Sequence, residues 1–350
     1  MVRPLVAALF ALACSCAYAE GLPRKGGLPE ERVDGVDIRY GDVRTSKGYR
    51  VRTYTSRPHG AAGKLPLAIF IPWLSCDAVE NPRNMKDGWS FALRAVMRDA
   101  GMQVVRIEKP GVGDSEGPDC GATDLDDDME AFRAGIRAAL ADPGADASRL
   151  YLIGGSVGGA LVPILAREVK PRAIVVSGGF SRTWLEHMLD IERRRLELEG
   201  KPPGEVNAAM RAFSGFYDET LNRGLTPGQA IAAHPAWKAF WYDEPTRQYG
   251  RPMRYYAQLQ ALDVEGAWKE VTVPTLVLRG GLDWIMGHEE AERAVGILRA
   301  RDPALVTYVV RPAMDHNLAT FADMKQAFAG RGGRVDEGAG PAITEWLKNH

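Results

Sequence analysis

The sequence predicts an α/β fold built on a mostly parallel, doubly wound sheet. Short apolar runs with strand character alternate along the chain with longer segments of helical spacing. Some of these runs are continuously apolar, as at 67–71 (Leu-Ala-Ile-Phe-Ile), which is typical of strands buried on both faces. Strands and helices that alternate in this way predict a parallel sheet covered by helices on both faces.

The elements follow from these patterns in chain order. Thr123 with Asp126 three residues later resembles a capping box and predicts the start of a helix, in which Phe132, Ile136 and Leu140 recur at helical spacing. Other helices are expected at 89–99, 158–167, 189–198, 289–299 and 341–348. Strands are expected at 36–43, 49–54, 67–71, 104–107, 150–153, 173–176, 274–278 and 306–310.

Composition and charge are those of an ordinary globular protein. The 350 residues include 44 basic and 45 acidic side chains, which gives a formal net charge of −1. This balance provides no overall field that would attract nucleic acid or an anionic membrane, so neither is an expected partner. The length suggests two domains, or one domain with a large insertion.

The first twenty residues differ from this average. Arg3 precedes an uncharged apolar run at 5–13, which is shorter than the about 20 residues that a membrane-spanning helix needs. Residues 17–19 (Ala-Tyr-Ala) have the small-x-small pattern of a signal cleavage site. We therefore expect 1–19 to be a signal peptide and the protein to be periplasmic or secreted. Lipoprotein anchoring at Cys14 is the lesser alternative.

A Gly-x-Ser-x-Gly motif follows the expected strand 150–153. Gly154, Ser156 and Gly158 take its fixed positions, and a helix is expected directly after it. Glycines allow a sharp turn without Cβ clashes, so this turn would raise the Ser156 hydroxyl above the sheet. Ligands of parallel sheets bind beyond the carboxyl ends of the strands, so the motif predicts a nucleophilic serine at a binding site.

A serine nucleophile needs a base to take its proton and an acid to orient that base. Asp283 comes in the loop after strand 274–278, and His316 comes in the loop after strand 306–310. The residues after strand 173–176 include no carboxylate that could serve instead. We therefore expect His316 as the base and Asp283 as the orienting acid.

Other candidates for these two roles are weaker. Asp315 is adjacent to His316, a position better suited to stabilising the loop than to orienting the imidazole. The remaining histidines do not follow an expected strand at its carboxyl end: His59, His187, His234, His288 and His350.

Taken together, these motifs resemble an α/β-hydrolase-fold serine hydrolase. The resemblance covers roughly 33–349 and includes 111–117 (Gly-Val-Gly-Asp-Ser-Glu-Gly), which is similar to a Gly-x-Gly-x-Ser motif of that superfamily. The run does not match the dinucleotide-binding motif, because Glu116 stands where the third glycine would be. The resemblance implies acyl transfer by side chains and water, with no cofactor and no metal.

The resemblance also implies an oxyanion hole made of two backbone N–H groups. Val157, directly after the nucleophile, would supply one of them. The loop after strand 67–71 would supply the other, but this chain has Pro72-Trp73-Leu74 where relatives often have His-Gly. Trp73 and Leu74 are therefore both candidates, with Leu74 preferred by position.

Two cysteines follow the expected signal peptide, Cys76 and Cys120. They are too few for a four-ligand zinc site, and in an oxidising compartment they form either a disulfide or two unpaired thiols. The resemblance implies that the loop of Cys76 lies beside the loop after Gly117. On that basis we expect a Cys76–Cys120 disulfide that pins the oxyanion loop.

The interval between the sixth and seventh main strands is where this superfamily inserts a cap. We accordingly expect a hydrolase core at 20–178 and 272–350 and a helical cap at 179–271, which is rich in helix formers and aromatic residues. Most of these aromatic residues would form the core of the cap, and several would line an apolar pocket over Ser156. The candidates for the pocket are Trp184, Phe240, Trp241, Tyr255 and Tyr256.

The sequence thus predicts an exported serine hydrolase that cleaves carboxylic esters, with a small apolar or aromatic ester as substrate. A serine peptidase or amidase is the alternative on the same scaffold. A non-catalytic binding protein with this fold is disfavoured, because all three triad positions are filled.

Overall fold

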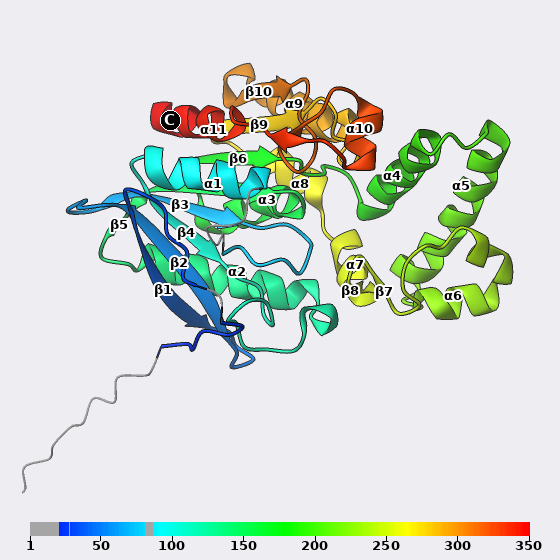
Figure 1. Cartoon of the computed structure of the whole chain (residues 1–350), viewed down its shortest axis with the longest axis horizontal. Coiled ribbons are helices and arrows are strands. Elements are labelled where there is room, and N and C mark those ends of the chain that lie inside the picture. The colour runs from blue at the N-terminus through cyan, green and yellow to red at the C-terminus, as the bar shows by residue number, and fades with distance from the viewer. Residues whose placement is uncertain (1–20, 28, 81–86) are drawn as a thin grey trace, which may run out of the picture.

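The computed structural model describes residues 21–27, 29–80 and 87–350 (Figure 1). The expected signal peptide, 1–19, lies outside these residues. Within the described part of the chain, no helix is both long and apolar enough to cross a membrane.

An eight-stranded sheet with the order β1-β2-β4-β3-β5-β6-β9-β10 forms the centre of the molecule. β2 pairs antiparallel with β1 and with β4, and the remaining pairs are parallel. The predicted fold class is therefore confirmed. The strands of this sheet are β1 (Val36–Arg44), β2 (Arg50–Pro58), β3 (Leu65–Ile71), β4 (Gln103–Ile107), β5 (Ala145–Gly155), β6 (Ala173–Ser177), β9 (Thr275–Gly280) and β10 (Val306–Arg311).

Helices cover both faces of the sheet. The covering helices are α1 (Gly88–Asp99), α2 (Leu125–Leu140), α3 (Val157–Val169), α9 (His288–Arg301) and α11 (Ala339–Asn349). In β3, Leu67, Ile69 and Ile71 pack in the apolar cluster that contains α2 and α3, whereas Ala68 and Phe70 pack in the cluster that contains α1 and α11. The continuous apolar run of β3 is thus explained by burial on both faces.

The start of α2 differs by one residue from the expectation. Asp124, not Thr123, is the N-cap, and it forms a capping box with Asp127. The Thr123 hydroxyl instead donates to the carbonyl of Cys120 at 2.8 Å. Asp124 and Asp127 can cap the helix because a carboxylate accepts the same N–H bonds as a hydroxyl.

Between β6 and β9 the chain leaves the sheet. Figure 1 shows α4, α5 and α6 at one side of the molecule, whereas α8 packs against α3. The elements of this interval are α4 (Trp184–Leu198), α5 (Pro203–Tyr217), a π-helix (Asp218–Asn222), α6 (Pro227–Ala233), a 3-10 helix (Pro235–Ala239), β7 (Arg247–Gln248), β8 (Arg251–Pro252), α7 (Met253–Gln260) and α8 (Val264–Glu270).

Short elements complete the chain after β4 and β9. They are the 3-10 helices Cys120–Ala122 and Pro303–Leu305, the ribbon of β11 (Ala319–Thr320) and β12 (Arg334–Val335), and α10 (Met324–Ala329). β11 begins three residues after His316 and pairs antiparallel with β12.

Candidate active site

Ser156 lies at the turn between β5 and α3. Its φ of 55° and ψ of −127° belong to a region that residues other than glycine rarely adopt. The turn is held on both sides, because the Ser156 N–H donates to the Ser177 carbonyl at 2.9 Å and its carbonyl accepts from the Gly159 N–H at 2.8 Å. The serine is thereby fixed at the carboxyl end of the parallel strands.

The two glycines of the motif are required by close backbone approaches. A Cβ on Gly154 would lie 2.5 Å from the Gly158 carbonyl oxygen. A Cβ on Gly158 would lie 2.1 Å from the carbonyl oxygen of Ile71 and 2.5 Å from that of Pro72. The first turn of α3 therefore lies directly against the end of β3, where the Trp73 loop begins.

The structure brings Ser156, His316 and Asp283 together. His316 Nε2 lies 3.0 Å from Ser156 Oγ, and His316 Nδ1 lies 2.9 Å from Asp283 Oδ2. The other carboxylate oxygen of Asp283 accepts the N–H groups of Ile285 at 3.0 Å and Met286 at 2.8 Å. These bonds orient the carboxylate toward the imidazole, and all three side chains are buried.

Asp283 also controls the charge of the imidazole. Burial alone would lower the pKa of His316, but the Asp283 carboxylate, with a smaller contribution from Asp315, outweighs this effect and raises the pKa above the ordinary value. The same carboxylate favours a proton on Nδ1, which leaves Nε2 free to accept the Ser156 hydroxyl in the neutral imidazole. This arrangement can remove a proton from Ser156 once the pH exceeds the pKa of His316.

Asp315 has a different role from Asp283. Its Oδ1 accepts the N–H groups of Asn317 at 2.9 Å and Ala319 at 2.8 Å. Burial raises the pKa of this carboxyl group. Asp315 thus stabilises the loop that follows His316, as the sequence suggested.

The sequence matches the family described as "Alpha/beta hydrolase family" over residues 73–331, which is more than half of the chain. The chain belongs to the alpha/beta hydrolase family. The resemblance carried by the motifs is therefore confirmed.

Solved structures share the α/β-hydrolase fold at low sequence identity. A hypothetical protein from Pseudomonas aeruginosa is 13% identical with a TM-score of 0.56, over 91% of this chain and 94% of that chain. An esterase from Pyrococcus furiosus is 13% identical with a TM-score of 0.55, over 92% and 97%. An acylaminoacyl peptidase from Pyrococcus horikoshii is 13% identical with a TM-score of 0.53, over 91% and 42%. No curated protein matches the sequence.

A cavity of about 540 Å³ opens over Ser156 and His316 in this α/β hydrolase. The side of α4 that faces it repeats at helical spacing and consists of Trp184, His187, Met188 and Ile191. Its other walls come from α1 and from the loops after β3, β9 and β10: Trp73, Leu74, Ser75, Asp77, Asp87, Trp89, Ser90, Trp284, Ile285, Met286 and Asn317. Most of this lining is apolar or aromatic, and Tyr249 adds a ring from the interval between β6 and β9.

Of the five predicted pocket residues, Trp184 lines the cavity. Phe240 and Trp241 pack elsewhere, around the aromatic cluster of α5, with Trp241 at 4.4 Å from Phe216 between ring centroids. The expectation for these two residues is corrected, because their rings fill the small core between α5 and the 3-10 helix that precedes them.

Tyr255 and Tyr256 also lie behind the cavity wall, and this expectation is corrected as well. The Tyr255 ring lies under the Arg251 guanidinium at 4.7 Å. The Tyr256 ring stacks on Trp184 at 5.4 Å between centroids, and so supports the cavity wall from behind. Both residues lie on the buried side of α7, which the aromatic composition of the interval alone could not reveal.

His187 is a cavity residue that the sequence analysis missed. Its ring lies 4.9 Å from Trp184 and 5.8 Å from Phe180 between centroids. Burial lowers its pKa to about 3, with Arg194 and His316 adding to the effect, so the imidazole is neutral near pH 7. The signal was present in the sequence, because residues 184, 187, 188 and 191 form one helical stripe.

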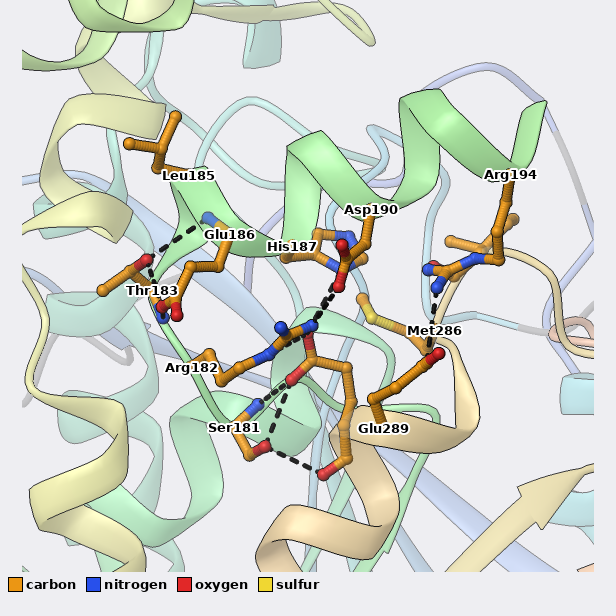
Figure 2. A network of polar contacts seen from close by, with 12 residues as sticks. Ser181, Arg182, Thr183, Leu185, Glu186, His187, Asp190, Arg194, Met286 and Glu289 are labelled. Atoms are coloured by element: carbon orange, nitrogen blue, oxygen red, sulfur yellow. Dashed lines mark hydrogen bonds and ion pairs between the residues drawn. The ribbon is translucent and has the colours of Figure 1, made fainter. Parts of the chain in front are cut away.

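A polar network fixes the start of α4 against α9 (Figure 2). The Arg182 guanidinium binds Glu290 of α9 at 2.9 Å, and the Ser181 N–H donates to the same carboxylate at 2.8 Å. Farther along α4, Arg194 donates to the carbonyls of Trp284 at 2.9 Å and Ile285 at 3.1 Å. The helix that lines the cavity is thereby joined to the loop that follows Asp283.

Trp73 and Leu74 line the cavity beside Val157, so both stay candidates for the second oxyanion donor. Cys76 in the same loop forms a disulfide with Cys120, as expected. Among the described residues, there is no group of three or more His, Cys, Asp or Glu side chains that could hold a metal ion.

Gly178 is a second residue whose importance the sequence did not indicate. It follows β6 with φ +65°, and a Cβ there would lie 3.0 Å from His316 Cε1 and 3.1 Å from His316 Nδ1. The absence of a side chain at this position thus gives the imidazole its place next to Asp283.

We expect Gly178→Ala to lower kcat about 10- to 100-fold, because the added methyl group would displace the His316 ring. Gly200→Ala is the matched control, since Gly200 has φ +75° and nothing within 4 Å of its Cβ position. Both variants should lose about 1 kcal/mol of stability through the positive φ. Equal kcat values for the two variants in a hydrolase assay would show that Gly178 does not position His316.

Proposed function

We propose that this α/β hydrolase cleaves carboxylic esters through an acyl-enzyme on Ser156. The observation that carries the proposal is the continuous set of contacts from Asp283 through His316 to Ser156, at the base of an apolar cavity. A serine, a base and an orienting acid in this order can perform nucleophilic acyl transfer.

In the first half-reaction, Ser156 Oγ attacks the carbonyl carbon of the ester while His316 Nε2 takes the hydroxyl proton. Asp283 stabilises the imidazolium that forms, through the Nδ1–H bond. The former carbonyl oxygen, now negatively charged, accepts hydrogen bonds from the N–H of Val157 and from an N–H of the Trp73 loop, for which Leu74 is preferred. The tetrahedral intermediate then expels the alcohol, which receives the proton from His316.

In the second half-reaction, water attacks the acyl carbon and gives a proton to His316 Nε2. The second tetrahedral intermediate releases the carboxylic acid, and Ser156 Oγ regains the proton from His316. The balance is one ester and one water converted to one alcohol and one acid, so the proposal requires no cofactor.

We further propose that 179–271 acts as a cap and that the cavity beneath it selects small apolar or aromatic esters. Four tryptophans contribute to the lining: Trp73, Trp89, Trp184 and Trp284. Asp77 and Asp87 also line the cavity, and no lysine or arginine does so within the described part of the chain. This lining favours uncharged substrates over anionic ones.

We also propose that the protein is exported. The signal-like pattern at 1–19 and the disulfide between Cys76 and Cys120 support this proposal, because disulfides persist mainly in oxidising compartments.

A substrate panel separates the esterase from the peptidase alternative. We expect p-nitrophenyl acetate, butyrate and benzoate to be cleaved with higher kcat/KM than aminoacyl p-nitroanilides of similar size. Faster cleavage of the anilides would favour a peptidase or amidase. Cleavage of neither class, with no reaction of Ser156 toward a fluorophosphonate, would instead favour a non-catalytic protein.

A further inference from the structure

Two buried cations bind the backbone carbonyls of residues 73–77, which we call the oxyanion loop. The Lys109 ammonium donates to the carbonyls of Ser75 at 2.6 Å, Asp77 at 3.2 Å and Trp73 at 3.4 Å. The Arg251 guanidinium donates through Nε to the carbonyl of Leu74 at 3.1 Å. Four carbonyls of one short loop are therefore held by charged donors, and the disulfide of Cys76 holds the loop at a fifth point.

The two cations come from different parts of the chain. Lys109 follows β4 of the core, whereas Arg251 lies in β8, within the proposed cap interval. Arg251 also binds the Asp128 carboxylate at 2.8 Å and the Thr123 hydroxyl at 2.6 Å. It thus ties the oxyanion loop to the start of α2 and to the interval that carries the cavity helix α4.

The burial of these charges calls for an explanation other than stability. Lys109 and Arg251 are both 0% exposed. Removing paired charges from water costs several kcal/mol for each ion, and apolar residues of similar volume often give equal or greater stability. Hydrogen bonds from charged donors are nevertheless stronger than neutral ones, and the 2.6 Å bond from Lys109 to the Ser75 carbonyl has the short length typical of them.

The carbonyl bonds determine the directions of the N–H groups in the loop. A trans peptide group is planar, so the N–H of one residue points opposite to the carbonyl of the residue before it. The bond from Lys109 to the Trp73 carbonyl therefore directs the Leu74 N–H away from Lys109. The bond from Arg251 to the Leu74 carbonyl fixes the Ser75 N–H in the same manner.

We infer that Lys109 and Arg251 are positioning residues that fix the oxyanion loop, and with it the Leu74 N–H, for stabilisation of the transition state. The inference rests on the proposed function of Ser156. Loss of one oxyanion donor typically lowers kcat by about 10²- to 10³-fold, so partial misplacement of a donor is expected to cost about 10- to 100-fold.

Lys109 offers a test that needs no substitution. Burial, with a smaller contribution from the Arg251 charge, lowers the pKa of Lys109 to about 8. The carboxylates of Glu108, Asp128 and Asp77 oppose this shift. Above this pH the neutral amine has two N–H groups for three carbonyls. We therefore expect kcat of the wild-type protein to decline above about pH 8. A kcat that stays level to pH 10 would contradict the role of Lys109.

The main experiment compares p-nitrophenyl butyrate with its thiono counterpart, in which sulfur replaces the carbonyl oxygen. Sulfur is a weak acceptor, so the thiono ester gains little from oxyanion donors. In Arg251→Met and Lys109→Met we expect kcat for the oxygen ester to fall about 10- to 100-fold. KM should stay nearly constant, and kcat for the thiono ester should fall much less. Arg251→Lys should recover part of the loss, because an ammonium can still reach one carbonyl.

Arg52→Met is the matched control for loss of a buried cation. Arg52 is 2% exposed and binds the Asp114 carboxylate and the Leu22 carbonyl, away from the oxyanion loop. The Arg52→Met substitution should lower the unfolding temperature without changing the ratio of kcat for the two esters.

If Arg251→Met lowers kcat equally for the oxygen ester and the thiono ester, the positioning role is overturned. Labelling of Ser156 by a fluorophosphonate in the folded wild-type protein would then show that Ser156 is still supported as the nucleophile of the proposed function.

Discussion

Replacing Ser156 with alanine is expected to lower kcat for p-nitrophenyl butyrate by about 10⁴- to 10⁶-fold, because no other group can form the acyl-enzyme. Alanine meets the same backbone strain at φ 55°, and the substitution removes one oxygen next to His316. The unfolding temperature should therefore change by only a few degrees. Steady-state kinetics together with a thermal melt measure both effects.

Ser115→Ala is the matched control for this substitution. Ser115, in the loop after β4, is buried as well, and its hydroxyl accepts the backbone N–H of Arg52 at 3.0 Å. The control should lose some stability but keep kcat within a few fold. If Ser156→Ala retained more than about a hundredth of the wild-type kcat, the esterase reaction would have to proceed without Ser156.

Asp283→Asn is expected to lower kcat by about 10⁴-fold with the fold intact. The amide oxygen can still accept the N–H groups of Ile285 and Met286, but the amide cannot stabilise an imidazolium or favour the proton on Nδ1. The pH dependence of activity should also change in this variant. Asp283 raises the pKa of His316, so activity is lost as the pH falls through that raised value. In the variant this acid limb should move to lower pH.

Asp315→Asn distinguishes the orienting acid from its neighbour. Asp315 is adjacent to His316 in sequence but binds the N–H groups of Asn317 and Ala319. We expect kcat to stay within about tenfold of wild type. The acid limb of the pH profile should move to lower pH by less than in Asp283→Asn, because the charge of Asp315 raises the pKa of His316 less than Asp283 does. A larger loss of kcat in Asp315→Asn than in Asp283→Asn would assign the orienting role to Asp315.

The main sheet could be predicted from the sequence because its signals are local. Continuous apolar runs at β3 and β6 mark strands buried on both faces, and all eight predicted strands occur in the sheet. The predicted ends of the strands were less accurate. β5 begins at Ala145 rather than 150, since Ala145 and Asp146 pair with Leu65 and Pro66 beyond a register shift. The local pattern of apolar residues does not predict such pairing between strands.

The residues brought together in the site were predictable for a related reason. Ser156, Asp283 and His316 each follow a strand, and parallel topology places the carboxyl ends of those strands at one edge. The cavity aromatics depend instead on which side of each helix is buried against its neighbours. Trp184 and Tyr256 stack on each other, yet only Trp184 faces the cavity. That distinction comes from tertiary packing.

The oxyanion-loop cations had no sequence pattern that would have predicted their role. Lys109 follows β4 and Arg251 lies in the two-residue strand β8, 142 positions apart in the sequence. Their convergence on one set of carbonyls depends on how the interval between β6 and β9 folds back onto the loop after β3. Long-range polar contacts of this kind are specified by geometry, which periodicity does not describe.

The central claim is that Ser156 is the nucleophile of this α/β hydrolase. Its most direct test is mass spectrometry of the intact protein after reaction with a fluorophosphonate, followed by peptide mapping. We predict one adduct for each protein molecule, located on Ser156, and no adduct in Ser156→Ala or in wild type unfolded before the reaction. An unlabelled folded wild type, or an adduct on another residue, would contradict the claim.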